Sequence, residues 1–435
     1  MTDIIAKSEA FLAKWGASPV NIDMEQLLSQ FNDEMEKGLA EDGASSLQMI
    51  PTYTKVVDEV SKGESVIVLD AGGTNFRTCL VTFDEQGTAH IEDFRKTAMP
   101  GVKREVTAKE FFTTFADEVE RLIDKSDKIG FCFSYAATIT EDHDGIPLVF
   151  SKEIKAPEVI GKPVGANLLA ELARRGYDVS KKKVAVLNDT VATLLAGTAA
   201  LSEVPYSGYI GFILGTGTNT AYVEQNAKIG KIAPTEGSQI INIESGNFDY
   251  CPGPLDRSFF DSTKHPGQYH LEKMISGAYL GPLSSVVIEK AIEEGILSTT
   301  FAKRFKEIAP INTTVMSNYL EMPFNKGYAL VACCEGNEED AAALWTIINS
   351  VIAKAGKLTA ANLAATVLKS GAGTDPRRPV CINADGTTFY KTEYLKKYTE
   401  HYLYKYLEVE RKRYYRFVRI DDSPTIGAAI AGLSL

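Results

Sequence analysis

Two short turns of similar composition, each set between two apolar runs, constrain this 435-residue chain more than any other feature. The first is Gly72-Gly73-Thr74-Asn75, and the second is Thr216-Gly217-Thr218-Asn219. The flanking runs, such as VIVLD at 66–70 and TCLVTF at 78–83, are typical of buried β-strands joined by a tight hairpin. We therefore predict a duplicated architecture, in which two similar α/β domains face each other across a cleft.

Further apolar runs extend this α/β pattern along the chain. Residues 129–133, 183–187 and 380–383 are short and apolar, which predicts buried strands. Helical periodicity marks 1–47 and most of 268–370, and an Ala- and Leu-rich segment predicts a helix over 190–199. Ser423 and Pro424 have the residue types of an N-cap and a first helical position, so we expect a helix over 424–433.

The first glycine-rich turn has the chemistry of a phosphate-binding loop. Glycine adopts positive φ and allows backbone N–H groups to point into one anion-binding nest. Thr74 and Asn75 add side-chain donors, and Arg77 adds a positive charge. Asp70, at the strand end, suits a Mg²⁺ ion held through water. A plain hairpin turn is the structural alternative, and neither turn matches a P-loop or a G-x-G-x-x-G fingerprint.

The pair Asn188-Asp189 follows the apolar run 183–187. Open α/β sheets bind ligands at the carboxyl ends of their strands. A carboxylate there, beside a phosphate site, suits a general base that accepts a hydroxyl proton during phosphoryl transfer. The structural alternative is that Asp189 only caps the helix that follows.

The formal net charge of −11 argues against nucleic acids and anionic membranes as partners, because both need a basic surface. No apolar run of about 18 residues predicts a membrane span, and the first 20 residues lack a secretory pattern. The six cysteines form no C-x-x-C pair, and the five histidines show no zinc-ligand spacing. We therefore expect a soluble, cytoplasmic protein without a protein-built metal site.

Eight blocks in a fixed order carry a family resemblance over nearly the whole chain. They are MEKGLAEDGASSLQMIPTY (35–53), VLDAGGTNFR (68–77), GFCFSYAATI (130–139), LVFSKEI (148–154), VLNDTVATLLAG (186–197), GFILGTGTNTAYVE (211–224), NIESGNF (242–248) and EKMISGAYLG (272–281). No single block is specific. The ordered set resembles the eukaryotic-type hexokinase and glucokinase family.

This resemblance implies a two-domain, actin-like (ribonuclease H-like) kinase fold, in which each domain is a mixed sheet with flanking helices. The implied small domain is 64–189 with 423–435, and the large domain is 1–63 with 190–422. The implied reaction is ATP-dependent phosphorylation of a hexose, D-glucose at its 6-hydroxyl in the first place, giving hexose 6-phosphate and ADP. The implied partners are the hexose and ATP with Mg²⁺, with the protein acting as a monomer or homodimer.

The resemblance also implies roles for individual residues. Asp189 matches the catalytic base, with Lys152 as the second catalytic residue. The sugar contacts are expected from Ser134, Ser151, Lys152, Asn188, Asp189, Asn219, Glu244 and Glu272. The nucleotide side is expected to comprise Asp70, Gly72, Gly73, Thr74, Asn75, Arg77, Gly215, Thr216 and Ser423. No direct metal ligand is implied, and Mg²⁺ is expected through water near Asp70 and Asp189.

These residue types suit a sugar, because a hexose offers only hydroxyl groups. Carboxylates, amides and hydroxyls can pair with each of them, and a site built this way rejects an analogue lacking a hydroxyl by ~10⁴-fold. The structural alternatives are that Glu244 and Glu272 are solvated charges and that Lys152 is a surface lysine. We further expect sugar binding to close the two domains and exclude water.

Several positions depart from the family pattern. Ser134-Tyr135-Ala136 replaces the family's Ser-Phe-Pro, 150–154 (FSKEI) replaces Trp-Thr-Lys-Gly-Phe, and 243–246 (IESG) replaces Thr-Glu-Trp-Gly. On the adenosine side, 422–425 (DSPT) replaces Gly-Ser-Gly-Lys. The sequence therefore leaves open a kinase that prefers mannose, fructose or glucosamine, a phosphoryl donor other than ATP, and a non-catalytic sugar sensor on the same scaffold.

Overall fold

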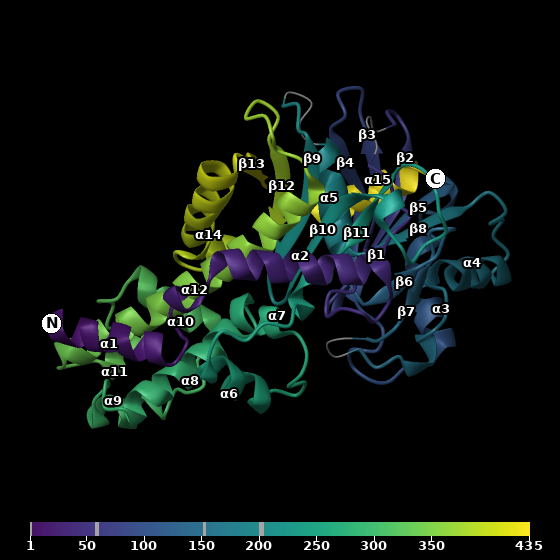
Figure 1. Ribbon diagram of the computed structural model, residues 1–435. Coiled ribbons are helices and arrows are strands. Elements are labelled where there is room, and N and C mark those ends of the chain that lie inside the picture. Colours follow the sequence, from purple (N-terminus) through teal and green to yellow (C-terminus); the bar gives the residue numbers. More distant parts are fainter. Residues whose placement is uncertain (1, 57–60, 151–153, 200–203) are drawn as a thin grey trace.

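The computed structural model describes residues 2–56, 61–150, 154–199 and 204–435. Within these residues, two large β-sheets are separated by a layer of two helices (Figure 1). Figure 1 shows helices α3 and α4 on the right-hand side of the molecule and α1, α9 and α11 at its lower left. This is a two-sheet α/β architecture with flanking helices, as the sequence predicts.

The larger sheet has six strands in the order β1-β11-β10-β9-β12-β13. Their bounds are β1 Ile50–Pro51, β9 Gly208–Leu214, β10 Thr218–Gln225, β11 Ser238–Asn242, β12 Val380–Asp385 and β13 Tyr415–Val418. Strands β9 and β10 form the second predicted hairpin, and β12 runs parallel to β9. The carboxyl ends of β9 and β12 therefore meet at the same edge of the sheet.

The smaller sheet has five strands in the order β4-β3-β2-β5-β8, and a separate two-stranded ribbon pairs β6 with β7. Their bounds are β2 Ser65–Gly72, β3 Asn75–Phe83, β4 Ala89–Ala98, β5 Lys128–Phe133, β6 Ala137–Ile139, β7 Gly145–Pro147 and β8 Lys183–Leu187. Strands β2 and β3 form the first predicted hairpin. These strands and α15 come from the segments that the sequence assigns to the small domain, whose exact boundaries stay a prediction.

The helices surround both sheets. Their bounds are α1 Thr2–Lys14, α2 Met24–Ala40, α3 Ala108–Val119, α4 Val164–Arg174, α5 Asp189–Ala199, α6 Pro254–Ser262, α7 His270–Ile275, α8 Leu280–Glu293, α9 Thr299–Phe305, α10 Thr313–Glu321, α11 Ala329–Cys333, α12 Glu338–Ser370, α13 Thr387–Lys391, α14 Leu395–Leu403 and α15 Ser423–Leu433. Capping fixes several of these ends. Thr107 and Glu110, for example, form a capping box at the start of α3.

The alternation of side chains along β2 explains why helices cover both faces of the small sheet. Ile67 and Leu69 point into one core, which also contains residues of α3 and α4. Val66 and Val68 point to the opposite face, into a core shared with α5 and α15. Successive side chains of a strand alternate between faces, so an uninterrupted apolar run such as VIVL requires cover on both.

Helices α5 and α15 form the layer between the two sheets, with α5 on the large sheet and α15 on the small one. Two glycines allow this close packing. A Cβ atom at Gly427 would lie 1.8 Å from the carbonyl oxygen of Ala192, and one at Gly130 would lie 1.9 Å from that of Ala428. A larger side chain at either position would force the segments apart. The two glycines therefore permit the close packing of α15 against α5 and against β5.

Helix α12 is the central helix of the large core. It is long and apolar enough to pass a length-and-composition test for a membrane span, but 94% of its apolar window is buried inside the protein. A core helix passes the same test. Three of its lysines are buried, and two of them contact the N-terminal segment or its neighbours: Lys354 pairs with Asp256 at 2.6 Å and donates to the Gly16 carbonyl at 2.8 Å, and Lys357 donates to the Ile22 carbonyl at 2.8 Å. These contacts fix the N-terminal segment against the core.

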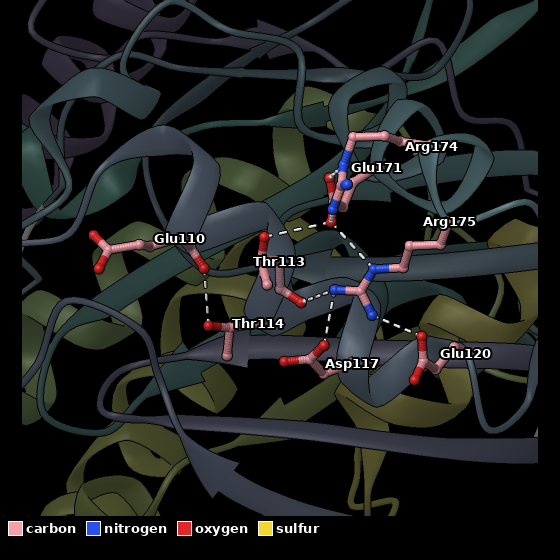
Figure 2. A network of polar contacts seen from close by, with 8 residues as sticks. All are labelled: Glu110, Thr113, Thr114, Asp117, Glu120, Glu171, Arg174 and Arg175. Atoms are coloured by element: carbon pink, nitrogen blue, oxygen red, sulfur yellow. Dashed lines mark hydrogen bonds and ion pairs between the residues drawn. The ribbon is translucent and has the colours of Figure 1, made fainter.

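On the outer face of the small sheet, one arginine ties α3 to α4 (Figure 2). Arg175, just after α4, contacts Glu120 at 2.6 Å, Asp117 at 2.8 Å and Glu171 at 3.1 Å. Arg174 pairs with the same Glu171 at 2.7 Å, and these hydrogen bonds lower the pKa of Glu171 to about 2. The network stiffens the small sheet on the side away from the cleft.

One local prediction is wrong. The last helix begins at Ser423 itself, and the residue before it, Asp422, adopts the left-handed conformation with a φ of 54°. Ser423 is therefore the first helical residue and not the N-cap. Its hydroxyl is completely buried, donates to the Ile420 carbonyl at 2.7 Å and accepts from Asn383 at 3.1 Å.

Candidate active site

The first hairpin turns through two residues between β2 and β3, with Gly72 paired opposite Asn75. Gly73 has a φ of 60°, which favours glycine at the first turn position. Ser134, which follows β5, lies directly beside this turn: its N–H donates to the Ala71 carbonyl at 3.1 Å, and a Cβ on Gly72 would lie 3.3 Å from its hydroxyl. The structure thus brings Ser134, assigned to the sugar, next to the hairpin assigned to the nucleotide.

Asp70 and Arg77 are cross-strand neighbours on β2 and β3, and their side chains form an ion pair. Asp70 is only 5% exposed, and burial raises the pKa of its carboxyl, against the opposing effect of Arg77. The nearby charge of Asp189 raises this pKa further. Arg77, expected as a positive charge aimed at phosphate, is therefore engaged by Asp70, and its guanidinium serves first to compensate a buried carboxylate.

Asn188 and Asp189 lie between the end of β8 and the first turn of α5. The side chain of Asn188 accepts from the Thr190 N–H at 2.8 Å, and its carbonyl accepts from the Ala192 N–H at 3.0 Å. Asn188 is thus the capping residue, which removes the structural alternative for Asp189. The Asp189 carboxylate accepts a 3.3 Å hydrogen bond from the Thr190 hydroxyl.

The second hairpin has a three-residue turn, Gly215-Thr216-Gly217, held by neighbouring segments. The Gly215 carbonyl accepts from the Gly277 N–H at 2.9 Å and from the Thr388 hydroxyl at 2.8 Å, and the Thr216 carbonyl accepts from the Ala278 N–H at 3.1 Å. Thr216 remains exposed at the tip. Its hydroxyl therefore stays available to a ligand, while the turn backbone is fixed from two sides.

Three polar residues form one network on the large sheet. Asn219 of β10 donates to Asn242 of β11 at 2.7 Å, and Asn242 donates to the Glu244 carboxylate at 2.8 Å. Asn219 also lies 3.4 Å from Glu244 Oε1 and 3.4 Å from Asn188 Oδ1. Glu244 itself has a φ of 57°, an uncommon backbone conformation for this residue type. The network aligns residues from two strands and the start of α5.

Glu272, in the first turn of α7, completes the group. Its Oε2 accepts from the Thr218 N–H at 3.0 Å, so it is fixed against the second hairpin. A Cβ on Gly217 would lie 2.5 Å from that oxygen, which explains the glycine there. Burial raises the pKa of Glu244 to about 7, with the negative charges of Asp189 and Glu272 adding to the rise after a partial offset by Asn242. Three carboxylates therefore share one small region.

Asp189 connects the two halves of this arrangement. Its charge raises the pKa of Asp70 at the base of the first hairpin and the pKa of Glu244 beside the second hairpin, so Asp189 lies within electrostatic reach of both. Of the predicted sugar residues, Asn188, Asn219, Glu244 and Glu272 lie together beside the second hairpin, and Ser134 lies beside the first. That Asp189 faces a space shared by both hairpins, as the sequence-based mechanism requires, stays a prediction.

Three further residues are assigned to the site by the sequence analysis. Ser151 and Lys152 lie outside the described residues, so their predicted roles stay predictions. Ser423, assigned to the nucleotide side, is completely buried, with its hydroxyl bonded at both ends inside the protein. Its side chain holds α15 against β12, and no hydroxyl surface is left for a nucleotide.

Asn242 is a residue that the sequence analysis did not single out. Its amide joins Asn219 to Glu244, and it is only 4% exposed. A signal was present, because an asparagine that ends an apolar strand two residues before a candidate carboxylate shares that carboxylate's side of the strand. Polar side chains in such a position require a buried partner.

The donor set also bears on Mg²⁺. Among the described residues, no group of three or more His, Cys, Asp or Glu side chains could hold a metal ion. Asp70 and Asp189 are nevertheless carboxylates beside a glycine-rich turn, and Mg²⁺ prefers oxygen ligands while keeping several waters. The residues present fit an ion that arrives with nucleotide phosphates and is contacted through water.

Two α/β sheets on either side of a helix layer, with one glycine-threonine hairpin on each sheet, match the architecture predicted for a sugar-kinase type of phosphotransferase. Comparisons with known proteins agree. A family model described as Hexokinase matches residues 209–434, and a second with the same description matches 18–199. The chain belongs to the hexokinase family, and it is a phosphotransferase that acts on a hexose.

Individual relatives cover most of the chain. Hexokinase-2 of Solanum tuberosum is 28% identical over 94% of this chain and 88% of its own length. Hexokinase of Schistosoma mansoni is 31% identical over 69% of this chain and 68% of its own. A solved structure described as hexokinase from Schistosoma mansoni complexed with glucose is 25% identical, covers 100% of this chain and 99% of its own, and has a TM-score of 0.79. The similarity thus extends over both sheets.

Proposed function

We propose that the chain transfers the γ-phosphoryl group of ATP to the 6-hydroxyl of D-glucose, with Asp189 as the general base. One observation carries this proposal: Asn188, and not Asp189, caps α5, and the charge of Asp189 raises the pKa both of Asp70 beside the first hairpin and of Glu244 beside the second. The relative whose structure holds glucose supports D-glucose as the hexose. Kinases of this family use ATP, which supports the nucleotide.

In this mechanism the large sheet orients the sugar. The Glu244 and Glu272 carboxylates accept hydrogen bonds from sugar hydroxyls, and the Asn219 and Asn188 amides provide further partners. Asp189 accepts the proton of the 6-hydroxyl as the oxygen attacks phosphorus. Mg²⁺, carried on the nucleotide near Asp70 and Asp189, would supply charge neutralisation. Closing the two sheets around the sugar would exclude water and prevent wasteful hydrolysis.

The test is the substitution Asp189→Ala in the full chain. General-base catalysis contributes ~10²–10⁴-fold, so kcat with glucose and ATP should fall by at least that factor. Nucleotide binding, measured by calorimetry, should persist. Asp33→Ala, on the exposed face of α2, is the matched control and should keep full activity. Near-normal turnover by Asp189→Ala would refute the assignment.

A different hexose is the second candidate. Ser245 stands where the family has a tryptophan, and it is completely buried beside Thr220 at 3.0 Å. The small side chain changes the packing directly behind Glu244, which favours an altered sugar preference. Comparing kcat/KM for glucose, mannose, fructose and glucosamine decides between them, and equal or lower efficiency on glucose would displace the first choice. No turnover of any hexose would favour a sugar sensor.

We also propose the cytoplasm as the compartment. All six cysteines are free in the structure, and free thiols are typical of a reducing environment. The same proposal extends to a monomer or homodimer without nucleic-acid or membrane partners, supported by the net charge of −11. Fractionation and light scattering of the purified chain test these two points.

A further inference from the structure

The side chain of Tyr135 reaches the tip of the first hairpin. Its hydroxyl donates a hydrogen bond to the Gly73 carbonyl at 2.7 Å. Tyr135 is only 2% exposed, and its ring packs against Phe133 and Phe150, with centroid distances of 5.0 Å and 5.2 Å. The core of the small sheet therefore fixes the ring, and the fixed ring presents its hydroxyl to the turn between β2 and β3.

This hydrogen bond sets the direction of one peptide group in the turn. The Gly73 carbonyl and the Thr74 N–H belong to the same trans peptide, in which the two groups point in opposite directions. Because the carbonyl points to Tyr135, the Thr74 N–H points away from Tyr135. Gly73 has a φ of 60° and Thr74 a negative φ, the combination of a type II′ turn. Types I′ and II′ differ in the orientation of this peptide, and the hydroxyl favours one of them.

The same turn carries N–H groups without a protein acceptor. Over the ranges that the structure describes, neither Gly73 nor Thr74 donates its N–H to another group. The carbonyls of both residues are engaged, because Tyr135 binds that of Gly73 and the Met99 N–H donates to that of Thr74 at 3.0 Å. Successive N–H groups left free at a turn form an anion-binding nest. A phosphate oxygen is an acceptor that suits them.

Two consecutive residues hold this hairpin from outside. The Ser134 N–H donates to the Ala71 carbonyl on β2 at 3.1 Å, and Tyr135 holds the tip. Burial raises the pKa of the Tyr135 hydroxyl, and the charge of Asp70 raises it further, so the phenol stays a donor at neutral pH. The family pattern has Phe-Pro where this chain has Tyr135-Ala136. A proline restricts the residue before it, and in this chain the hydroxyl supplies a restraint that Ala136 does not.

We propose that Tyr135 is a positioning residue for phosphoryl transfer, whose hydroxyl keeps the N–H groups of the first hairpin turned toward the nucleotide phosphates. The proposal rests on the proposed function, because it takes this hairpin as a phosphate site. Tyr135 acts through the turn and not on the substrates themselves. Its loss should therefore weaken the use of ATP while leaving the affinity for glucose unchanged.

The test is Tyr135→Phe in the full chain, which removes the hydroxyl and keeps the ring packing. One hydrogen bond changes an equilibrium by about 2- to 10-fold, and misplaced reacting groups lose up to ~10²-fold in rate. We therefore expect kcat/KM for ATP-Mg²⁺, measured at saturating glucose, to fall by about 3- to 50-fold. Glucose affinity by calorimetry should stay within about twofold, below the effect of one lost hydrogen bond. A fall in kcat/KM for ATP-Mg²⁺ of less than about threefold would overturn the proposal.

Tyr319→Phe is the matched control. Tyr319 of α10 is 1% exposed and donates its hydroxyl to the Ala341 carbonyl at 3.1 Å, so its replacement removes the same kind of buried hydrogen bond from the large core. Thermal melts should record a similar small loss of stability for both variants. Only Tyr135→Phe should lose efficiency with ATP-Mg²⁺. Equal kinetic losses in both variants would show a general loosening of the fold and would also overturn the proposal.

Nucleotide binding separates this inference from the proposed function. Calorimetry with ATP-Mg²⁺ probes the hairpin without turnover, and Tyr135→Phe should weaken that affinity by more than about threefold while leaving the affinity for adenosine unchanged. If the wild-type chain phosphorylates no hexose, the proposed function fails, and this calorimetric difference still decides whether Tyr135 positions the hairpin. Equal losses for ATP-Mg²⁺ and adenosine, or no loss for either, would refute the inference.

Discussion

The substitution Glu244→Gln should make the protein more stable at alkaline pH while weakening sugar binding. Burial raises the pKa of Glu244 to about 7 from its ordinary value of 4.5, with Asp189 and Glu272 adding to the rise. A carboxyl whose pKa is higher in the folded state stabilises the fold fully below the unfolded value, and this contribution is lost as pH rises through the folded value. The window is therefore pH 4.5 to about 7.

The magnitude follows from the size of the pKa shift. One unit corresponds to about 1.4 kcal/mol, so ionised Glu244 costs the folded protein up to about 3 kcal/mol above pH 7. Partial exposure of the side chain reduces this, and we expect a gain of about 1–3 kcal/mol for Glu244→Gln at pH 8. Glutamine cannot ionise, yet its Oε1 can still accept the hydrogen bond that Asn242 now donates at 2.8 Å.

The assay is urea unfolding of the sugar-free protein at pH 5 and pH 8. The stability difference between variant and wild type should grow with pH in favour of glutamine. Glucose affinity should fall about 10- to 100-fold, the range for losing a charged hydrogen-bond acceptor. Glu321→Gln, the same change on an exposed side chain, controls for the loss of one charge. A stability difference that is the same at both pH values, or that favours glutamate at pH 8, would refute the reasoning.

Three further outcomes follow from the packing. Lys354→Met should destabilise the protein by about 3–5 kcal/mol, because it leaves the carboxylate of Asp256 buried and unpaired, and adding Asp256→Leu should recover much of the loss in urea unfolding. Gly427→Val should abolish soluble folded protein, because a Cβ there would lie 1.8 Å from the Ala192 carbonyl oxygen. Asn188→Ala should lose about 0.5–2 kcal/mol of stability, because it removes the side-chain cap of α5, and circular dichroism melts measure this loss. Asn188→Ser should keep the stability, because serine also caps helices, and should still lose glucose affinity as measured by calorimetry.

Each of these has a matched comparison. Lys326→Met removes an exposed lysine and should leave the stability unchanged. Gly43→Val is the comparison for Gly427→Val: a Cβ at Gly43 meets no neighbouring atom within 4 Å, so its only cost is the backbone strain of valine at a φ of 79°. A Lys354→Met protein as stable as wild type would contradict the buried ion pair. Soluble, active Gly427→Val would contradict the close crossing of α5 and α15. An Asn188→Ala variant with unchanged stability would indicate that Asp189, and not Asn188, caps α5.

The sequence by itself determined the strands and the two turns. A short apolar run such as 66–70 that ends at a glycine-rich turn is typical of a buried strand, and a glycine is favoured where the chain turns with φ near 60° at Gly73. The ordered blocks likewise indicated the family and the residues to examine. These features depend on neighbouring residues or on the order of motifs along the chain, so the amino-acid sequence alone is enough to predict them.

Only the tertiary structure decided what each polar side chain does. Arg77 was expected to face phosphate, but the register of β2 and β3 sets it opposite Asp70, whose buried charge needs a partner. Ser423 was expected at the nucleotide, but the crossing of β12 and α15 buries it. Asn242 emerged as the link between Asn219 and Glu244 because three segments meet there. Such roles depend on which polar groups, distant in the sequence, are buried next to one another. The spacing of residues along the chain does not determine these neighbours.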